Sequence, residues 1–88
     1  GAEAKYLVAL QLYKAHEYAA AEKEILNFIE QSTPHAYWLA RSFILLSDVY
    51  VAMDKKLDAR QYLLSLQQNY HADNDIEQMI NERLEKLK

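Results

Sequence analysis

The chain has 88 residues, about half of them hydrophobic, which excludes a disordered polar tail and allows one small domain with its own core. Glycine and proline occur once each, which excludes most tight β-turns and favours an all-α chain. The net charge of −3 with scattered basic residues argues against a nucleic-acid ligand, and the absence of cysteine excludes disulfides and thiolate metal sites.

The first predicted helix covers residues 2–15 and is apolar around most of its circumference. Tyr6, Leu10 and Tyr13 share one stripe, while Val8 and Leu12 lie nearly opposite. An amphipathic surface helix shows a single apolar stripe. The pattern therefore predicts neighbours on two sides of this helix, and its own hairpin supplies only one of them.

The second predicted helix follows His16-Glu17. Its apolar residues recur at helical spacing, at Tyr18, Ala21, Ile25, Phe28 and Ile29. It ends before Pro34, because the residue preceding a proline is pushed out of the helical region. Pro34 opens the third and longest helix, residues 34–53, with Ser32 or Thr33 as its cap.

Two further helices complete the predicted chain. A turn at residues 54–56 leads into a helix over 57–70, and His71-Ala72-Asp73 breaks it. The last helix begins at Asn74 or Asp75, with Asn74 and Glu77 spaced as a capping box, and carries one apolar stripe. No apolar run approaches the roughly 20 residues that cross a bilayer, so direct membrane insertion is not expected.

The sequence matches itself at an offset of 38 residues. The motifs Val8-Ala9-x-x-Leu12 and Ala21-x-x-x-Ile25-x-x-Phe28 recur as Leu46-Ser47-x-x-Tyr50 and Ala59-x-x-x-Leu63-x-x-Leu66. Such a repeat predicts stacked helical hairpins: one over 2–33, a second over 34–72, and a capping helix over 73–88.

These motifs resemble the tetratricopeptide repeat, whose pattern is Trp-x-x-Leu-Gly-x-x-Tyr followed by Ala-x-x-x-Phe. The second copy reads Phe43-x-x-Leu46-Ser47-x-x-Tyr50 and then Ala59-x-x-x-Leu63. The resemblance covers residues 2 to about 72. It implies an all-α, right-handed superhelical array of about five helices, from the C-terminal end of a longer bacterial repeat protein. The 38-residue offset then corresponds to a 34-residue repeat with one additional helical turn at the start of the third helix.

The resemblance also implies a partner-binding surface on the first helix of each hairpin. By position, the side chains on this surface are Tyr6, Leu10, Tyr13, Lys14, Arg41, Ile44, Asp48 and Val51. They form an apolar groove with an acidic spot at Asp48 and a basic rim at Lys14 and Arg41. The alternative is that the apolar members pack against neighbouring helices. The Lys and Asn of the family's carboxylate-binding members are absent from these positions.

The expected function is binding of a protein or peptide partner, without catalysis, cofactor or metal. His16-Glu17 lacks the second histidine of a metalloprotease helix, since Ala20 stands there, and Asp73-x-Asp75 lacks the glycine of a calcium loop. Two alternatives stay open: a homodimerisation or assembly segment that stacks through the first helix, and a helical accessory domain of a larger enzyme or envelope complex. The stretch from Thr33 to Ser42 resembles envelope-associated bacterial members, which indicates the periplasm without excluding the cytoplasm.

Overall fold

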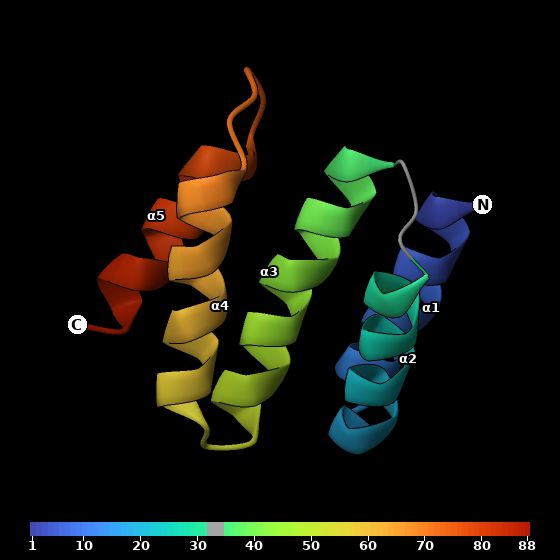
Figure 1. Ribbon diagram of the computed structural model, residues 1–88. Helices are drawn as coiled ribbons and strands as arrows, with labels where there is room; N and C mark the ends of the chain where they lie inside the picture. Colours follow the sequence, from blue (N-terminus) through green and yellow to red (C-terminus); the bar gives the residue numbers. More distant parts are fainter. Residues whose placement is uncertain (32–34) are drawn as a thin grey trace.

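The computed structural model describes residues 1–31 and 35–88 and shows an all-α fold there, as the sequence predicts. The described residues form five helices and no strand (Figure 1). These helices are α1 (Ala2–Lys14), α2 (Tyr18–Glu30), α3 (Ala36–Ala52), α4 (Lys56–Asn69) and α5 (Ile76–Lys86). The longest is α3, with 17 residues.

The predicted helix ends differ from the observed ones by one or two residues, which is the usual uncertainty of helix boundaries. Helix α4 begins at Lys56, which the sequence had placed in the turn, and ends at Asn69 instead of Tyr70. The predicted start of the third helix at Pro34, and its cap at Ser32 or Thr33, lie outside the described residues.

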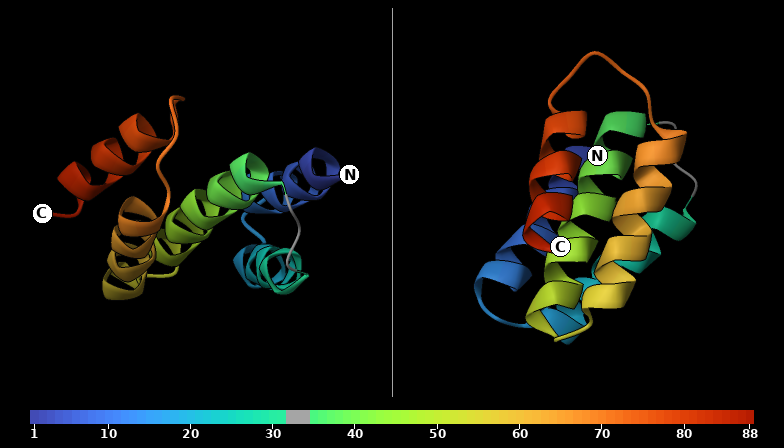
Figure 2. Two further views of the ribbon diagram at one scale, coloured as in Figure 1. Left: turned by 45° about the horizontal axis from the view of Figure 1, so that its top comes forward. Right: turned by 90° about the vertical axis from the view of Figure 1, so that its left-hand side faces the viewer.

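The helices form two layers around α3, which contacts all four others. Helices α1, α3 and α5 make one layer, and α2 and α4 make the other (Figure 2, left). Within the described parts of the chain, the backbones of α2 and α4 do not approach each other closely. This order of contacts is compatible with a stack of helical hairpins, and it leaves α1 at one end of the molecule and α5 at the other.

The core consists of two clusters of buried side chains that meet at α3 and α4. The first cluster joins α1, α2 and α3, with Ala59 from α4. Its members are Tyr6, Ala9, Ala21, Ile25, Leu45, Leu46, Val49, Tyr50 and Ala59. The second cluster holds α5 against α3 and α4, and its members are Ala40, Ile44, Leu63, Leu66, Ile76 and Ile80.

The two hairpin turns repeat at the 38-residue offset. His16 and Asp54 both have positive φ, at 62° and 61°. The Glu17 N–H donates to the Leu12 carbonyl, as Lys55 does to Tyr50. The N–H groups of His16 and Asp54 donate to the carbonyls of the residues three positions earlier. Each helix therefore ends in a Schellman motif with a left-handed residue, formed without glycine.

Small residues sit at matching places in the two copies and are fully covered. Ala9 and Ser47 are 2% and 1% exposed, and Ala21 and Ala59 are both 0% exposed. Small side chains at these places let the helices approach closely. The Ser47 hydroxyl donates to the Ile44 carbonyl at 2.6 Å within its own helix, so the polar group is satisfied although it is buried.

The predicted capping box of Asn74 and Glu77 is not formed. The N-cap of α5 is Asp75, which makes no side-chain cap hydrogen bond. Asn74 lies one residue earlier, and its Oδ1 accepts from the Ile76 N–H at 3.0 Å, as in an Asx turn. The Asn74 N–H donates to the Ala72 carbonyl at 3.0 Å, so the loop backbone already satisfies the group that Glu77 would bind in a capping box.

Candidate functional site

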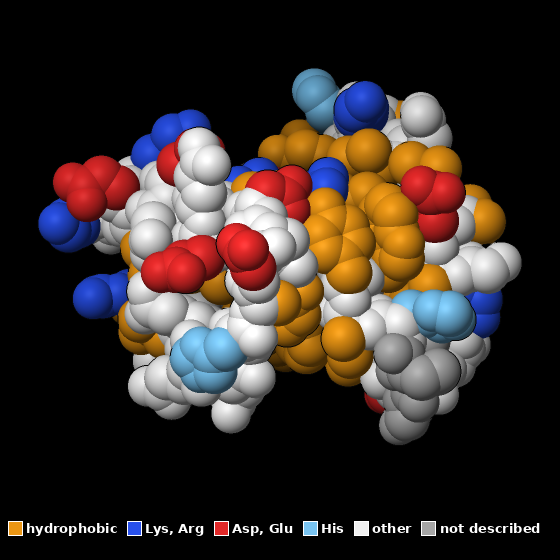
Figure 3. Space-filling view, turned by 90° about the horizontal axis from the view of Figure 1, so that it is seen from above, with side chains coloured by type: hydrophobic (Ala, Val, Ile, Leu, Met, Phe, Trp, Pro, Cys, Tyr) orange, Lys and Arg blue, Asp and Glu red, His pale blue; other side chains and the backbone are white. Residues whose placement is uncertain are grey.

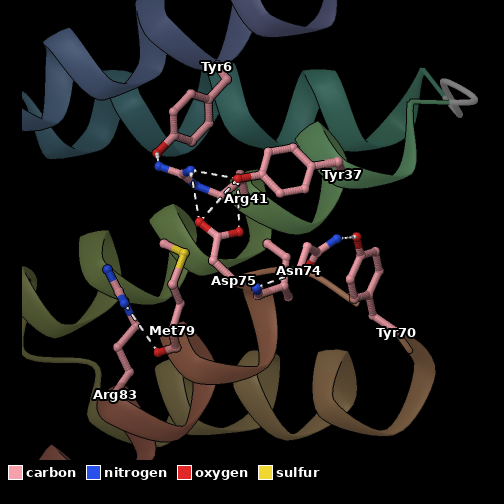
Figure 4. Close-up of polar contacts among 9 residues, drawn as sticks. Tyr6, Tyr37, Arg41, Tyr70, Asn74, Asp75, Met79 and Arg83 are labelled. Atoms are coloured by element: carbon pink, nitrogen blue, oxygen red, sulfur yellow. Dashed lines mark hydrogen bonds and ion pairs between the residues drawn. The ribbon is translucent and has the colours of Figure 1, made fainter. Parts of the chain in front are cut away.

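The candidate site is the face on which α1, α3 and α5 lie side by side, and most of the polar contacts between helices occur there (Figure 4). We call it the three-helix face and define it by seven residues: Tyr6, Tyr13, Tyr37, Arg41, Asp48, Asp75 and Arg83. They come from α1, α3, α5 and the residue that precedes α5. In a space-filling view from above, acidic and basic side chains lie beside hydrophobic ones in the middle of the molecule (Figure 3).

Arg41 is at the centre of this face, between two tyrosines. Its Nη2 donates to the Tyr6 hydroxyl at 3.1 Å, and its Nη1 donates to the Tyr37 hydroxyl at 3.0 Å (Figure 4). The guanidinium carbon lies 5.1 Å from the Tyr6 ring centroid and 5.9 Å from that of Tyr37, within cation–π range. The guanidinium is therefore fixed by α1 and by its own helix.

Burial by itself would lower the pKa of Arg41, but the hydrogen bonds to Tyr37 and Tyr6 outweigh burial and raise that pKa. Arg41 thus stays charged at every relevant pH. Among the described residues, its Nε is buried without a hydrogen-bond partner. All of its specific contacts are made through the two terminal nitrogens.

Asp75 extends the cluster to the start of α5. The Tyr37 hydroxyl donates to its two carboxylate oxygens at 3.0 and 3.3 Å, and Arg41 Nη1 lies 4.0 Å from Oδ2. The Asp75 side chain is 53% exposed, so the direct ion pair contributes at most about 1 kcal/mol. Tyr37 connects the two charges, since its hydroxyl accepts from Arg41 and donates to Asp75.

A second ion pair joins α3 and α5 further along the same face. Arg83 Nε and Nη2 donate to the two oxygens of Asp48 at 2.9 and 3.0 Å, in bidentate geometry. Arg83 Nη1 also donates to the Met79 carbonyl at 3.2 Å, which holds the guanidinium against its own helix. The Asp48 carboxylate is therefore used inside the molecule and is not an open acidic spot.

Tyr13 completes the face on α1. Burial raises the pKa of the Tyr13 hydroxyl, and the negative charge of Asp48 raises it further. The hydroxyl is therefore protonated at neutral pH and available as a hydrogen-bond donor.

The structure alters the predicted groove in several places. Ile44 is 1% exposed and belongs to the second core cluster, so its predicted place on the binding surface is wrong. Tyr6 is 6% exposed and Leu10 is half-buried against the first cluster. These two side chains thus follow the alternative interpretation, in which the apolar members of the groove pack against neighbouring helices. Lys14 is exposed, and Val51 is 39% exposed at the end of α3.

The sequence prediction missed Tyr37, Asp75 and Arg83. Tyr37 precedes Arg41 by four residues, a spacing at which side chains on a helix meet. The sequence therefore allows this contact to be predicted. The contacts of Asp75 and Arg83 depend on how α5 lies along α3, which helical spacing does not determine. Trp38 packs across the helices, with its ring centroid 5.4 Å from that of Tyr6.

The opposite side of α3 carries a hollow with no charged group. It has a volume of about 250 Å³ between α3 and α4, and it is lined by Ala36, Leu39, Ala40, Phe43, Leu66, Asn69 and Tyr70. The described residues contain no cluster of three or more His, Cys, Asp or Glu side chains placed to hold a metal ion. None of the helices in the described ranges has the length and hydropathy of a membrane span.

Comparison of this chain with protein-family models, with curated proteins and with solved structures finds no match.

Proposed function

We propose that this chain is a protein-interaction module of tetratricopeptide-like hairpins that binds a partner polypeptide on the three-helix face, without catalysis. The observation that supports this most is the cluster of Tyr6, Tyr37, Arg41 and Asp75, which joins α1, α3 and the residue that precedes α5. Tyrosine and arginine are the side chains most enriched among residues that dominate binding energies.

Preorganisation supports the same proposal. Arg41 and Tyr37 are each held by two specific contacts, so little side-chain entropy is lost when a partner arrives. The Asp75 carboxylate is half-exposed and has free acceptor capacity. A partner segment that donates from a lysine, an arginine or a backbone N–H would bind there, while its apolar side chains pack against the half-buried Tyr13 and Tyr37.

The net charge of the chain favours a basic partner segment. The chain carries −3 overall, and the exposed residues of α5 include the carboxylates of Glu77, Glu82 and Glu85. Such a charge distribution accelerates the encounter with a positively charged segment and makes binding sensitive to salt.

Site-directed crosslinking tests the proposal. A photo-reactive amino acid at Tyr37 is expected to capture the same protein from the native extract as one at Tyr13. The same probe at Leu57, which is 81% exposed on α4, should not capture it. Equal capture of this protein at Leu57 would contradict the proposal.

A charge reversal with a matched control makes the crosslinking test quantitative. Asp75→Lys places a like charge beside Arg41 and in the path of a basic partner, so capture at Tyr37 should fall at least about tenfold. Asp73→Lys makes the same charge change at an exposed position just before Asp75 and should leave capture within about twofold. Equal effects of the two variants would show that only net charge matters.

A further inference from the structure

The side of α1 that faces away from α3 exposes apolar residues, which lie outside both core clusters. Leu7 is 46% exposed and Val8 is 52% exposed. We call this side the outer face of α1 and define it by Glu3, Ala4, Leu7, Val8, Gln11 and Lys14. Helix α1 lies at one end of the molecule, so no other described helix covers this face (Figure 2, left).

The internal repeat shows that the equivalent face of α3 is covered by a helix. Leu7 and Val8 correspond to Leu45 and Leu46 at the 38-residue offset, and these are 3% and 0% exposed. They belong to the first core cluster, in which side chains of α2 pack against α3. At Leu7 and Val8 the outer face of α1 therefore carries large apolar residues where α3 carries covered ones, without the covering helix.

The opposite end of the molecule does not fit this face. Helix α5 turns polar residues outward, and those exposed are Glu77, Gln78, Asn81, Glu82, Glu85 and Lys86. A head-to-tail stack of copies would bury these carboxylates against Leu7 and Val8 without partners, which is costly. The occupant of the face is consequently not the α5 end of another copy.

The charges at the two ends of the face fit a second copy of the same helix. Glu3, Leu7 and Lys14 lie along one stripe, at spacings of four and seven residues. In an antiparallel pair with the twofold axis beside Val8, Glu3 of each copy meets Lys14 of the other. Val8 then meets its own counterpart across the axis, and Leu7 lies near Gln11. Such a contact is isologous, so it closes as a dimer.

We propose that the outer face of α1 is a self-association surface, on which two copies pair antiparallel through α1. One helix face on each side gives an interface below about 1,200 Å², the range of weak and transient contacts. We therefore expect a reversible dimer with a dissociation constant of about 0.1–1 mM. The dimer leaves the three-helix face open. The proposed dimer therefore does not depend on the function proposed above for that face.

Sedimentation of the whole chain as a function of concentration tests this proposal. The weight-average mass should rise from 10.3 kDa towards twice that value between about 10 μM and 1 mM. Val8→Lys places two like charges at the axis and should remove the rise. The control Leu57→Lys makes the same kind of change at an exposed leucine of α4 and should keep it. A mass that stays at 10.3 kDa, or an equal loss in the control, would overturn the proposal.

A charge exchange identifies the partner as a second α1. Glu3→Lys alone sets lysine against lysine, Lys14→Glu alone sets glutamate against glutamate, and each should weaken association about tenfold. An equimolar mixture of the two variants restores both pairs and should associate like the wild type. The matched mixture of Glu24→Lys and Lys23→Glu, both on the exposed side of α2, should gain nothing from mixing. If the first mixture associates no better than its components, α1 does not pair with itself.

Discussion

At the scale of single residues, the two hairpin turns place ordinary side chains in a conformation that favours glycine. His16 and Asp54 adopt the left-handed region, with φ of 62° and 61°. For a residue with a side chain this conformation costs roughly 1–2 kcal/mol. The Schellman hydrogen bonds at both turns compensate for that cost, because they satisfy helix carbonyls that would otherwise lack a partner.

We predict that Asp54→Gly stabilises the protein by about 0.5–1 kcal/mol, because glycine occupies the left-handed region without steric cost. The measurement is the midpoint of urea unfolding. Asp54→Asn isolates the part due to removing a negative charge from the C-terminal end of α3. Ala52→Gly, two residues earlier in the helix, should instead destabilise by about 0.5–1 kcal/mol. Destabilisation by Asp54→Gly would mean that the aspartate itself stabilises the turn.

A buried tyrosine predicts how stability depends on alkaline pH. Burial raises the pKa of Tyr50, and the hydrogen bond to Glu22 and its negative charge raise the pKa further. The folded-state pKa therefore lies above the unfolded value of about 10. The stability that comes from protonated Tyr50 is complete below pH 10 and is lost as the pH rises above 10. The loss amounts to at most about 1.4 kcal/mol per pH unit.

Tyr50→Phe should therefore lose less stability than the wild type between pH 8 and pH 11, although it starts from a lower value at pH 8. Urea unfolding at the two pH values gives the comparison, with each protein serving as its own reference at pH 8. Equal losses in the two proteins would show that Tyr50 does not control the alkaline response.

At the scale of single helices, α5 depends on its contacts with α3 and α4. It has 11 residues, too few for a stable isolated helix in water. Ile76 and Ile80 are 0% and 2% exposed in the second cluster, and Arg83 binds Asp48 through two hydrogen bonds. The apolar contacts and the ion pair thus hold the same helix. Substitutions can measure separately what each of them contributes to the free energy of unfolding.

We predict that Ile80→Ala destabilises the protein by about 2–4 kcal/mol, because it leaves a cavity under α5. The double-mutant cycle of Asp48→Asn and Arg83→Gln should give a smaller coupling, about 0.5–1 kcal/mol, since both side chains are about one quarter exposed. Chemical denaturation of the four proteins of the cycle and of Ile80→Ala supplies the values. A coupling that exceeds the loss in Ile80→Ala would show that the ion pair dominates the docking of α5.

Helical spacing predicts the existence and order of the five helices, because each carries at least one apolar stripe and the turns lack such stripes. Helical spacing does not predict which side chains of different helices meet on the three-helix face. Arg41 and Asp48 were expected to be open to a partner, but Tyr6, Tyr37 and Arg83 occupy their polar atoms. The missing information is the relative placement of α3 and α5, which tertiary packing sets.

At the scale of the whole molecule, the two repeat copies have similar sequences and unequal surroundings. Ile25 and Leu63 are both 1% exposed, so the copies agree inside each hairpin. Val8 and Leu46 differ, at 52% and 0%, because only α3 has a neighbour on that side. Repeat position alone therefore does not predict burial; the position of the hairpin in the stack is also needed.

This asymmetry predicts unequal effects at equivalent positions. Leu46→Ala should cost about 3 kcal/mol or more, since its side chain is fully enclosed. Val8→Ala should change the free energy of unfolding by less than about 0.5 kcal/mol, because the site is half-exposed. Both values should be measured at about 10 μM, well below the concentrations at which we expect self-association. Similar losses in the two variants would indicate that Val8 is covered in solution.

The position of α3 between the two core clusters has a mechanical consequence. If the molecule is stretched from its two ends, α5 is able to leave with the second cluster while the first stays packed, and α1 is able to leave from the other side. Helices α3 and α4 take part in both clusters and so are released last. A tethered molecule should therefore extend in separate steps, and under load the backbone amides of α3 and α4 should keep their hydrogen bonds longest.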